Sequence, residues 1–128
     1  MSLYKNQLGL SLIEVLISLL LLSLALLGLD AMNVMALRAN RAAYFLGVAT
    51  NQLQVMTDRL RVFKDTVSLD QQLLYWNVQN QQVLPEGYGT IRGHHPVYTL
   101  TIYWGNMPKD DCPKPQLGQS GCLQEKMA

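Results

Sequence analysis

The sequence predicts an α+β fold in which a long N-terminal helix packs on a small antiparallel β-sheet. A run of about 20 mostly aliphatic residues, 10–29, continues without a proline into an amphipathic segment that ends near Phe63. Further along, residues 97–104 alternate between apolar and more polar side chains, as a strand does. The 128 residues suffice for one domain, and the C-terminal half has room for only a small core.

Residues 10–29 have the length and composition of a transmembrane helix. About 20 helical residues cross the roughly 30 Å hydrocarbon core of a bilayer. The run exceeds the apolar stretch of an ordinary secretory signal, and no small-residue cleavage site follows it at Asp30. We therefore expect the segment to stay in the protein as an anchor. Lys5 on one side, with Arg38 and Arg41 on the other, gives a weak charge bias that does not set the orientation.

One carboxylate, Glu14, interrupts the aliphatic run close to its start. A charge at the centre of a membrane helix costs about 2.5–3.5 kcal/mol on insertion scales. Four residues after Leu10, the cost is smaller because the side chain lies only about 6 Å deep, yet an isolated carboxylate gains nothing there. Ionisable groups inside membranes usually have a function, so we expect Glu14 to have a partner. The alternative is a carboxylate that is solvated at the headgroup boundary and has no role.

The pattern Gly9-Leu10-Ser11-Leu12-Ile13-Glu14 resembles the prepilin signal of type IV pilins and type II secretion pseudopilins. In that family a dedicated peptidase cleaves after the glycine, on the cytoplasmic side, and methylates the new N-terminus. The resemblance implies a leader of residues 1–9 and a mature chain that begins with Leu10, where the family usually has Phe. It also implies that the freed amine of Leu10, on a neighbouring subunit or on the same chain, is the partner of Glu14 and sets the axial register of the subunits.

We expect the N-terminal helix to span residues 10–63, interrupted only by Gly28 and Gly47. Gly28, at the membrane exit, is an expected soft spot. Beyond the aliphatic run, apolar residues recur at alternating intervals of three and four, which predicts one stripe along the helix. This stripe fits packing against a sheet or against a second helix in a coiled-coil stalk, and its spacing does not decide between them. The stripe residues are Met32, Met35, Ala39, Ala42, Leu46, Ala49, Leu53, Met56, Leu60 and Phe63.

Residues 64–128 are predicted to form a small periplasmic α+β region. Apolar residues spaced four and three apart predict a short helix over residues 70–82, followed by a turn at LPEGYG. Residues 88–92 and 97–104 predict two strands joined by a hairpin loop, GHHP. In the second strand, one face is expected to cover the helix stripe and the other to be solvated. The covering face consists of Tyr98, Leu100, Ile102 and Trp104, and the solvated face of Val97, Thr99, Thr101 and Tyr103.

Cys112 and Cys122 enclose the Pro- and Gly-rich loop CPKPQLGQSGC. In an exported chain, an oxidising compartment favours a disulfide over two free thiols. Closing so short a loop contributes about 2–3 kcal/mol. Two cysteines without a CxxC pair do not indicate a zinc site, and His94 and His95 point in opposite directions on an extended chain. We therefore predict no metal site.

Nothing in the sequence predicts an enzyme, so we expect no catalytic residue, cofactor or small-molecule substrate. A P-loop, a nucleophile elbow and a paired-carboxylate constellation are all absent from the sequence. The net charge of +1, without a basic block, gives no electrostatic footprint for nucleic acid.

The C-terminal half adds a narrower resemblance. Trp76 in the short helix, the turn Leu84-Pro85-Glu86-Gly87 and the strand YTLTIYW together resemble PilV-type minor pilins, although core packing alone also explains Trp76 and Trp104. This likeness implies a pilin-like fold and a structural subunit that helps initiate or modify type IV pilus assembly. It implies as partners other minor pilins, the major pilin, the prepilin peptidase, the inner-membrane assembly platform, a tip adhesin and, before assembly, membrane lipid.

The expected location is the inner membrane, with one span and a periplasmic C-terminus, and then the pilus at the cell surface. Two alternatives stay open. A type II secretion pseudopilin shares every feature up to Phe63, and an unprocessed membrane-tethered interaction module shares the span without the cleavage.

Overall fold

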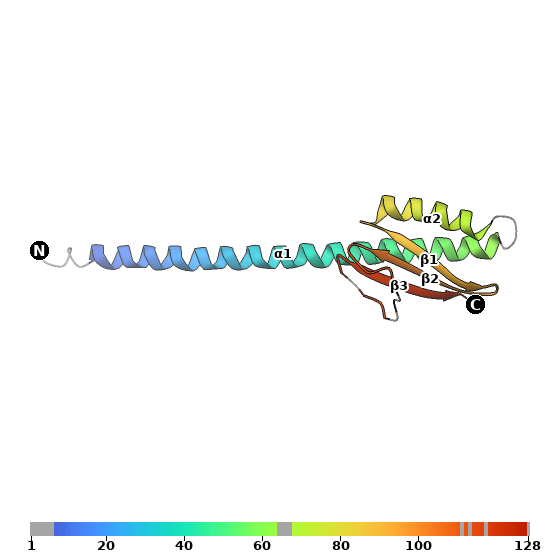
Figure 1. The fold of residues 1–128 in the computed structure, drawn as a ribbon. Helices are drawn as coiled ribbons and strands as arrows, with labels where there is room; N and C mark the ends of the chain where they lie inside the picture. Colours follow the sequence, from blue (N-terminus) through green and yellow to red (C-terminus); the bar gives the residue numbers. More distant parts are fainter. Residues whose placement is uncertain (1–6, 64–67, 111, 113, 117, 128) are drawn as a thin grey trace, which may run out of the picture. The chain divides into compact units, whose positions relative to one another are not determined.

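The computed structural model describes residues 7–63, 68–110, 112, 114–116 and 118–127. Its elements in chain order are two helices followed by three strands (Figure 1). They are α1 (Gln7–Val62), α2 (Leu69–Val83), β1 (Tyr88–His94), β2 (Val97–Trp104) and β3 (Gly121–Met127). The chain divides after Leu37 into two compact units, and α1 contributes residues to both. The expected α+β class is confirmed.

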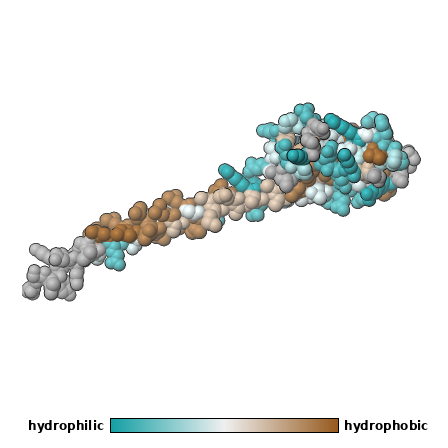
Figure 2. Space-filling model, turned by 90° about the horizontal axis from the view of Figure 1, so that it is seen from below, coloured by the Kyte–Doolittle hydropathy of each residue, from teal (hydrophilic) through white to brown (hydrophobic). Residues whose placement is uncertain are grey.

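The first unit contains the aliphatic part of α1. From Ser11 to Leu37 every residue is exposed, and Figure 2 shows hydrophobic residues in brown along this part. Leu12 and Leu27, for example, are 64 % and 66 % exposed. By length and composition α1 is able to cross a membrane. So continuous an apolar surface is stable in lipid or against other apolar surfaces, and not in water.

The second unit is built on a three-stranded antiparallel sheet in the order β1-β2-β3. The hairpin between β1 and β2 turns at His95 and Pro96, with His94 opposite Val97. The hairpin is confirmed, but its loop is shorter than the expected GHHP, because Gly93 and His94 pair with β2 and extend the strand expected over residues 88–92. β3 pairs along the whole of β2, from Met127 opposite Tyr98 to Gly121 opposite Trp104.

β3 is missing from the sequence prediction. Its sequence, GCLQEKM, contains no β-branched or aromatic residue and carries Gln, Glu and Lys in succession. Such residues have a low intrinsic preference for strands, so pairing with β2 must determine the conformation of this segment. The local sequence pattern therefore did not predict this strand.

The core lies between the sheet and the part of α1 that belongs to the second unit. The covering face of β2 packs there, as the alternation predicted. The buried members of this cluster include Ala49, Leu53, Met56, Leu60, Leu100, Ile102 and Trp104. Stripe residues outside this unit stay exposed: Met32 and Met35 are 68 % and 71 % exposed. The length of the sheet explains why these stripe residues stay exposed while those further along are buried. A strand of eight residues spans about 26 Å and can therefore cover only roughly 17 residues of a helix.

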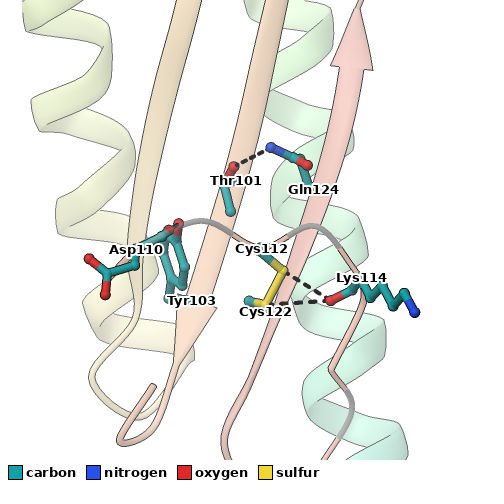
Figure 3. Close-up of a disulfide and its surroundings, with 7 residues drawn as sticks. All are labelled: Thr101, Tyr103, Asp110, Cys112, Lys114, Cys122 and Gln124. Carbon is teal, nitrogen blue, oxygen red and sulfur yellow. Dashed lines mark hydrogen bonds between the residues drawn. A yellow bond between two sulfur atoms is a disulfide. The ribbon is translucent and has the colours of Figure 1, made fainter. Parts of the chain in front are cut away.

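The opposite face of β2 is covered at one end, so the expectation that this face is solvated was wrong there. Thr101 and Tyr103 are each 3 % exposed. Tyr103 packs with the disulfide between Cys112 and Cys122, and its hydroxyl donates a hydrogen bond to the backbone carbonyl of Asp110 (Figure 3). The segment that joins β2 to β3 folds back over this face. The alternation of apolar and polar residues within β2 could not predict this, because it reports nothing about where a later segment packs.

α2 begins at a capped N-terminus. The Ser68 hydroxyl accepts a hydrogen bond from the Gln71 backbone N–H at 3.4 Å, and Asp70 places a negative charge in the first turn. Both features favour helix initiation at this point. The buried residues Gln72, Trp76 and Asn80 recur every four residues along one side of the helix. The short helix predicted over residues 70–82 is therefore confirmed, with one more residue at each end.

The inner side of α2 packs closely on β1. Trp76 is fully buried, and a Cβ atom added to Gly89 would lie 2.2 Å from the indole ring. The Asn77 side chain accepts from the Gly89 N–H at 2.7 Å and donates to the Gly89 carbonyl at 3.2 Å. Only glycine fits at position 89, because any side chain there would overlap the ring.

Candidate functional site in the N-terminal helix

The residues expected for processing and assembly lie at the start of α1. Gly9 and Leu10 have helical backbone, since α1 begins at Gln7. Residues 1–6 of the expected leader lie outside the described residues. Leu10 precedes Glu14 by four residues, which is about one helical turn, so the two positions lie on the same face of α1.

Glu14 lies on a strongly apolar surface. It is the only Asp, Glu, Lys or Arg between Ser11 and Leu29. Ile13, Ile17 and Ser18 surround it on the helix surface. Within the described part of the chain, its carboxylate forms no hydrogen bond or ion pair. The helix therefore presents an exposed carboxylate that its own described residues leave uncompensated.

Two hydroxyls in the same apolar part are satisfied inside the helix. The Ser18 Oγ donates to the Glu14 backbone carbonyl at 2.8 Å, and the Ser23 Oγ donates to the Leu19 carbonyl at 2.7 Å. Such bonds to the preceding turn remove the need for water or for a partner side chain. Glu14 thus differs from these serines, because it is a polar group that requires something outside its own helix.

Residues 4–29 match the family model of the prokaryotic N-terminal methylation motif. The chain carries this motif. The methylation motif is typical of type IV pilin-like proteins, and here it includes Gly9, Leu10 and Glu14. It indicates a type IV pilin-like or pseudopilin-type protein, and the long apolar helix indicates membrane anchoring. Comparisons with curated proteins and with solved structures found no match.

Near the end of the methylation motif, no described residue packs closely enough on Gly28 to require a glycine there. A Cβ atom added there would meet nothing within 4 Å. Gly89 and Gly121 differ, because a Cβ atom on either would overlap a tryptophan ring. A glycine inside a helix costs about 0.5–1 kcal/mol relative to alanine. Among the described residues, no close contact at Gly28 offsets this cost.

Outside the methylation motif, the structure contains the expected disulfide. Cys112 and Cys122 are joined with their Cα atoms 6.2 Å apart, and both residues are almost fully buried. Lys114 follows in the same loop, and its carbonyl oxygen lies 3.4 Å from the Cys112 Sγ (Figure 3). The bond ties the segment after β2 to the beginning of β3 and so holds the cover over Tyr103 in place.

The two histidines lie far from the methylation motif along the chain. His94 ends β1 and His95 lies in the following turn, and both are exposed. In the described ranges, no group of three or more His, Cys, Asp or Glu side chains is arranged to hold a metal ion.

Proposed function

We propose that the chain is a PilV-type minor pilin, a structural subunit that helps initiate or modify type IV pilus assembly. Glu14 carries the assembly part of the proposal, because its carboxylate lies in the apolar part of the methylation motif without a partner in the described part of its chain. The choice of a PilV-type minor pilin rests on the resemblance in the C-terminal half, at Trp76, the turn 84–87 and the strand YTLTIYW. Away from water, such a charge is stabilised only by a counter-charge or by hydrogen-bond donors. Cleavage after Gly9 creates a counter-charge, the α-amino group of Leu10.

The proposed pair would determine how far one subunit is displaced along the next. The surface of α1 from Leu19 to Leu22 is uniformly aliphatic, and the neighbouring turns differ little. Such a surface gains nearly the same contacts when a partner helix slides by one turn, so it specifies an axial position poorly. An ion pair at 4 Å contributes about 4 kcal/mol at an effective dielectric constant of 20, and a slip by one helical turn would lose roughly 40 % of this.

The same helix would serve two environments in succession. Before assembly, the span holds the subunit in the inner membrane, with the disulfide-containing unit in the oxidising periplasm. During assembly, the apolar surface exchanges lipid for the helices of other minor pilins and the major pilin. The prepilin peptidase, the assembly platform and a tip adhesin complete the proposed set of partners. The exposed stripe residues Met32 and Met35 extend the surface available to neighbouring helices.

Mass spectrometry of the native protein tests this function. The expected mature chain begins at Leu10 and carries one methyl group on its amine. A Gly9→Val variant, made as a control, should keep residues 1–9 and stay in the membrane. If chains in assembled filaments still carry residues 1–9, the proposed pair has no amine and the proposal fails.

Co-purification distinguishes a type IV pilus subunit from a type II secretion pseudopilin. A minor pilin should be recovered with the major pilin in sheared filaments. Recovery with components of a type II secretion system would instead support a pseudopilin, with the same role for Glu14. A native chain that begins at Met1 or Ser2 and is found in neither would indicate a membrane-tethered module.

A further inference from the structure

β3 forms one edge of the sheet, and part of its outer side is unpaired. On that side Cys122 exchanges two backbone hydrogen bonds with Gln116, at 3.0 and 3.1 Å. In antiparallel strands every second residue directs its N–H and C=O to the same side, so Gln124 and Lys126 direct theirs outward too. No described residue bonds to these outward backbone groups. Two donors and two acceptors are therefore available at this edge.

The opposite edge of the sheet is closed at one position, Gly89, which lies level with Leu123 across the sheet. On β1, Gly89 directs its backbone groups away from β2, since Tyr88 and Thr90 face β2 with theirs. The Asn77 side chain bonds to both the N–H and the carbonyl of Gly89. An amide side chain thus takes the place of a neighbouring strand at this one position of β1, and among the described residues no side chain caps Gln124 or Lys126 of β3 in the same way.

β3 is also held firmly enough to act as a template. Met127 is 7 % exposed and belongs to the core, and Leu123 packs against it. On the other face, the Gln124 side chain donates to the Thr101 hydroxyl at 3.4 Å (Figure 3). Gln116 already occupies this edge in the manner of an added strand, so an incoming strand would continue that pairing from residue 123 onward.

Charge selects between the occupants of this edge. Glu125 and Lys126 are exposed, and neither forms an ion pair within the described part of the chain. Two copies of β3 could use all the free backbone groups only with Gln124 of each opposite Lys126 of the other. That register places Glu125 directly opposite its own copy, and like charges in this position are destabilising. The edge therefore disfavours a second copy of this chain.

We propose that the outer edge of β3 is a docking site for an extended segment of another protein. The segment adds as a fourth, antiparallel strand, with Lys or Arg opposite Glu125 and Asp or Glu opposite Lys126. Backbone hydrogen bonds to Gln124 and Lys126 supply the affinity, and the two charge pairs supply the specificity. The site lies outside the methylation motif of residues 4–29 and does not depend on cleavage or on the role of Glu14.

A synthetic peptide tests the proposal on the full-length chain in detergent micelles. The probe is acetyl-Thr-Val-Glu-Lys-Thr-Val-amide, whose Glu, Lys and Thr would lie opposite Lys126, Glu125 and Gln124. Amide hydrogen exchange, followed by NMR, is the readout. When the protein is saturated with peptide, hydrogen exchange of the Gln124 and Lys126 backbone amides should slow at least tenfold. The amides of Leu123 and Glu125, which face β2, should change little and serve as internal controls.

Two further peptides and one variant separate a docked strand from general charge attraction. A peptide with Glu and Lys interchanged should bind about tenfold more weakly, because both cross-strand pairs become repulsive. A peptide N-methylated at its Glu and at the Thr that follows Lys should not bind, because it lacks the donors that face β3. A variant with both Glu125→Lys and Lys126→Glu should prefer the interchanged peptide.

Three results would overturn the proposal. One is unchanged exchange at Gln124 and Lys126 in millimolar peptide. Another is equal binding of the N-methylated peptide. The third is protection of both amides that rises with protein concentration without peptide, which would identify a second copy as the occupant.

Discussion

The indole N–H of Trp76 donates a hydrogen bond to the backbone carbonyl of Gln52 over 3.2 Å. This bond links α2 to α1 within the second unit, while the ring of Trp76 lies against the backbone of Gly89 in β1. One side chain thus fixes the positions of three elements. Its burial is complete, so both its packing and its hydrogen bond contribute without competition from water.

Replacing Trp76 with Phe should lower the free energy of unfolding by about 2–4 kcal/mol, because the change leaves a cavity and removes the donor to Gln52. Leu74→Ala is the matched control on the same helix, since Leu74 is 69 % exposed. It should change stability by less than about 0.5 kcal/mol. Thermal unfolding in detergent, followed by near-UV circular dichroism, measures both. Similar losses in the two variants would contradict the structural role of Trp76.

Alanine at two glycines should have opposite effects. In Gly89→Ala the new Cβ atom would lie 2.2 Å from the Trp76 ring, so we expect a loss of about 3 kcal/mol through overpacking. In Gly47→Ala the new atom meets nothing within 4 Å, and α1 should gain about 0.5–1 kcal/mol. The same unfolding experiment compares them. A stable Gly89→Ala protein would mean that α2 and β1 are less closely packed than described.

Breaking the disulfide should destabilise the second unit by about 3 kcal/mol, the value expected from the chain entropy of a short closed loop. Denaturant unfolding with and without a reductant measures this loss. The control is a variant in which both Cys112 and Cys122 are replaced by Ser. It should have the lower stability from the start and show no response to the reductant. The tyrosine signal of Tyr103 should change with the bond, since the disulfide covers its ring.

Glu14→Gln should allow cleavage after Gly9 but reduce incorporation into filaments at least tenfold, since loss of the proposed ion pair removes a few kcal/mol. The ratio of this subunit in sheared filaments to that in membranes measures incorporation. Asp30→Asn is the control, because it removes a carboxylate that lies just beyond the aliphatic run. Wild-type incorporation of Glu14→Gln would rule out the register role.

Elements with a local signature could be predicted from the sequence. The spacing of three and four along α1, and the alternation in β2, each depend on residues a few positions apart. The prediction placed Leu100 and Trp104 on the buried face of β2, and both are fully buried. It also identified the short helix around Trp76, because Leu69 and Leu73 share a face with it.

Elements determined by distant pairing could not be predicted. β3 is a strand because β2 offers an edge, and its own Gln124, Glu125 and Lys126 suggest a loop. The cover over Tyr103 depends on where the disulfide loop returns, and the cap on Gly89 depends on the position of Asn77 on a separate helix. At the candidate site, Glu14 was identified from its charge in an apolar run together with its register relative to Gly9, although its proposed counter-charge exists only after a covalent change.

The serine hydroxyls in the span have a consequence for transfer between phases. Ser18 and Ser23 donate to carbonyls of their own helix, so neither group relies on the medium around it. Neither of these two hydroxyls would lose its partner if the segment passed from a bilayer into a bundle of other helices. In a membrane-anchored chain, the carboxylate of Glu14 would then be the charge within residues 11–29 that opposes such a transfer, and whatever neutralises it would ease the transfer.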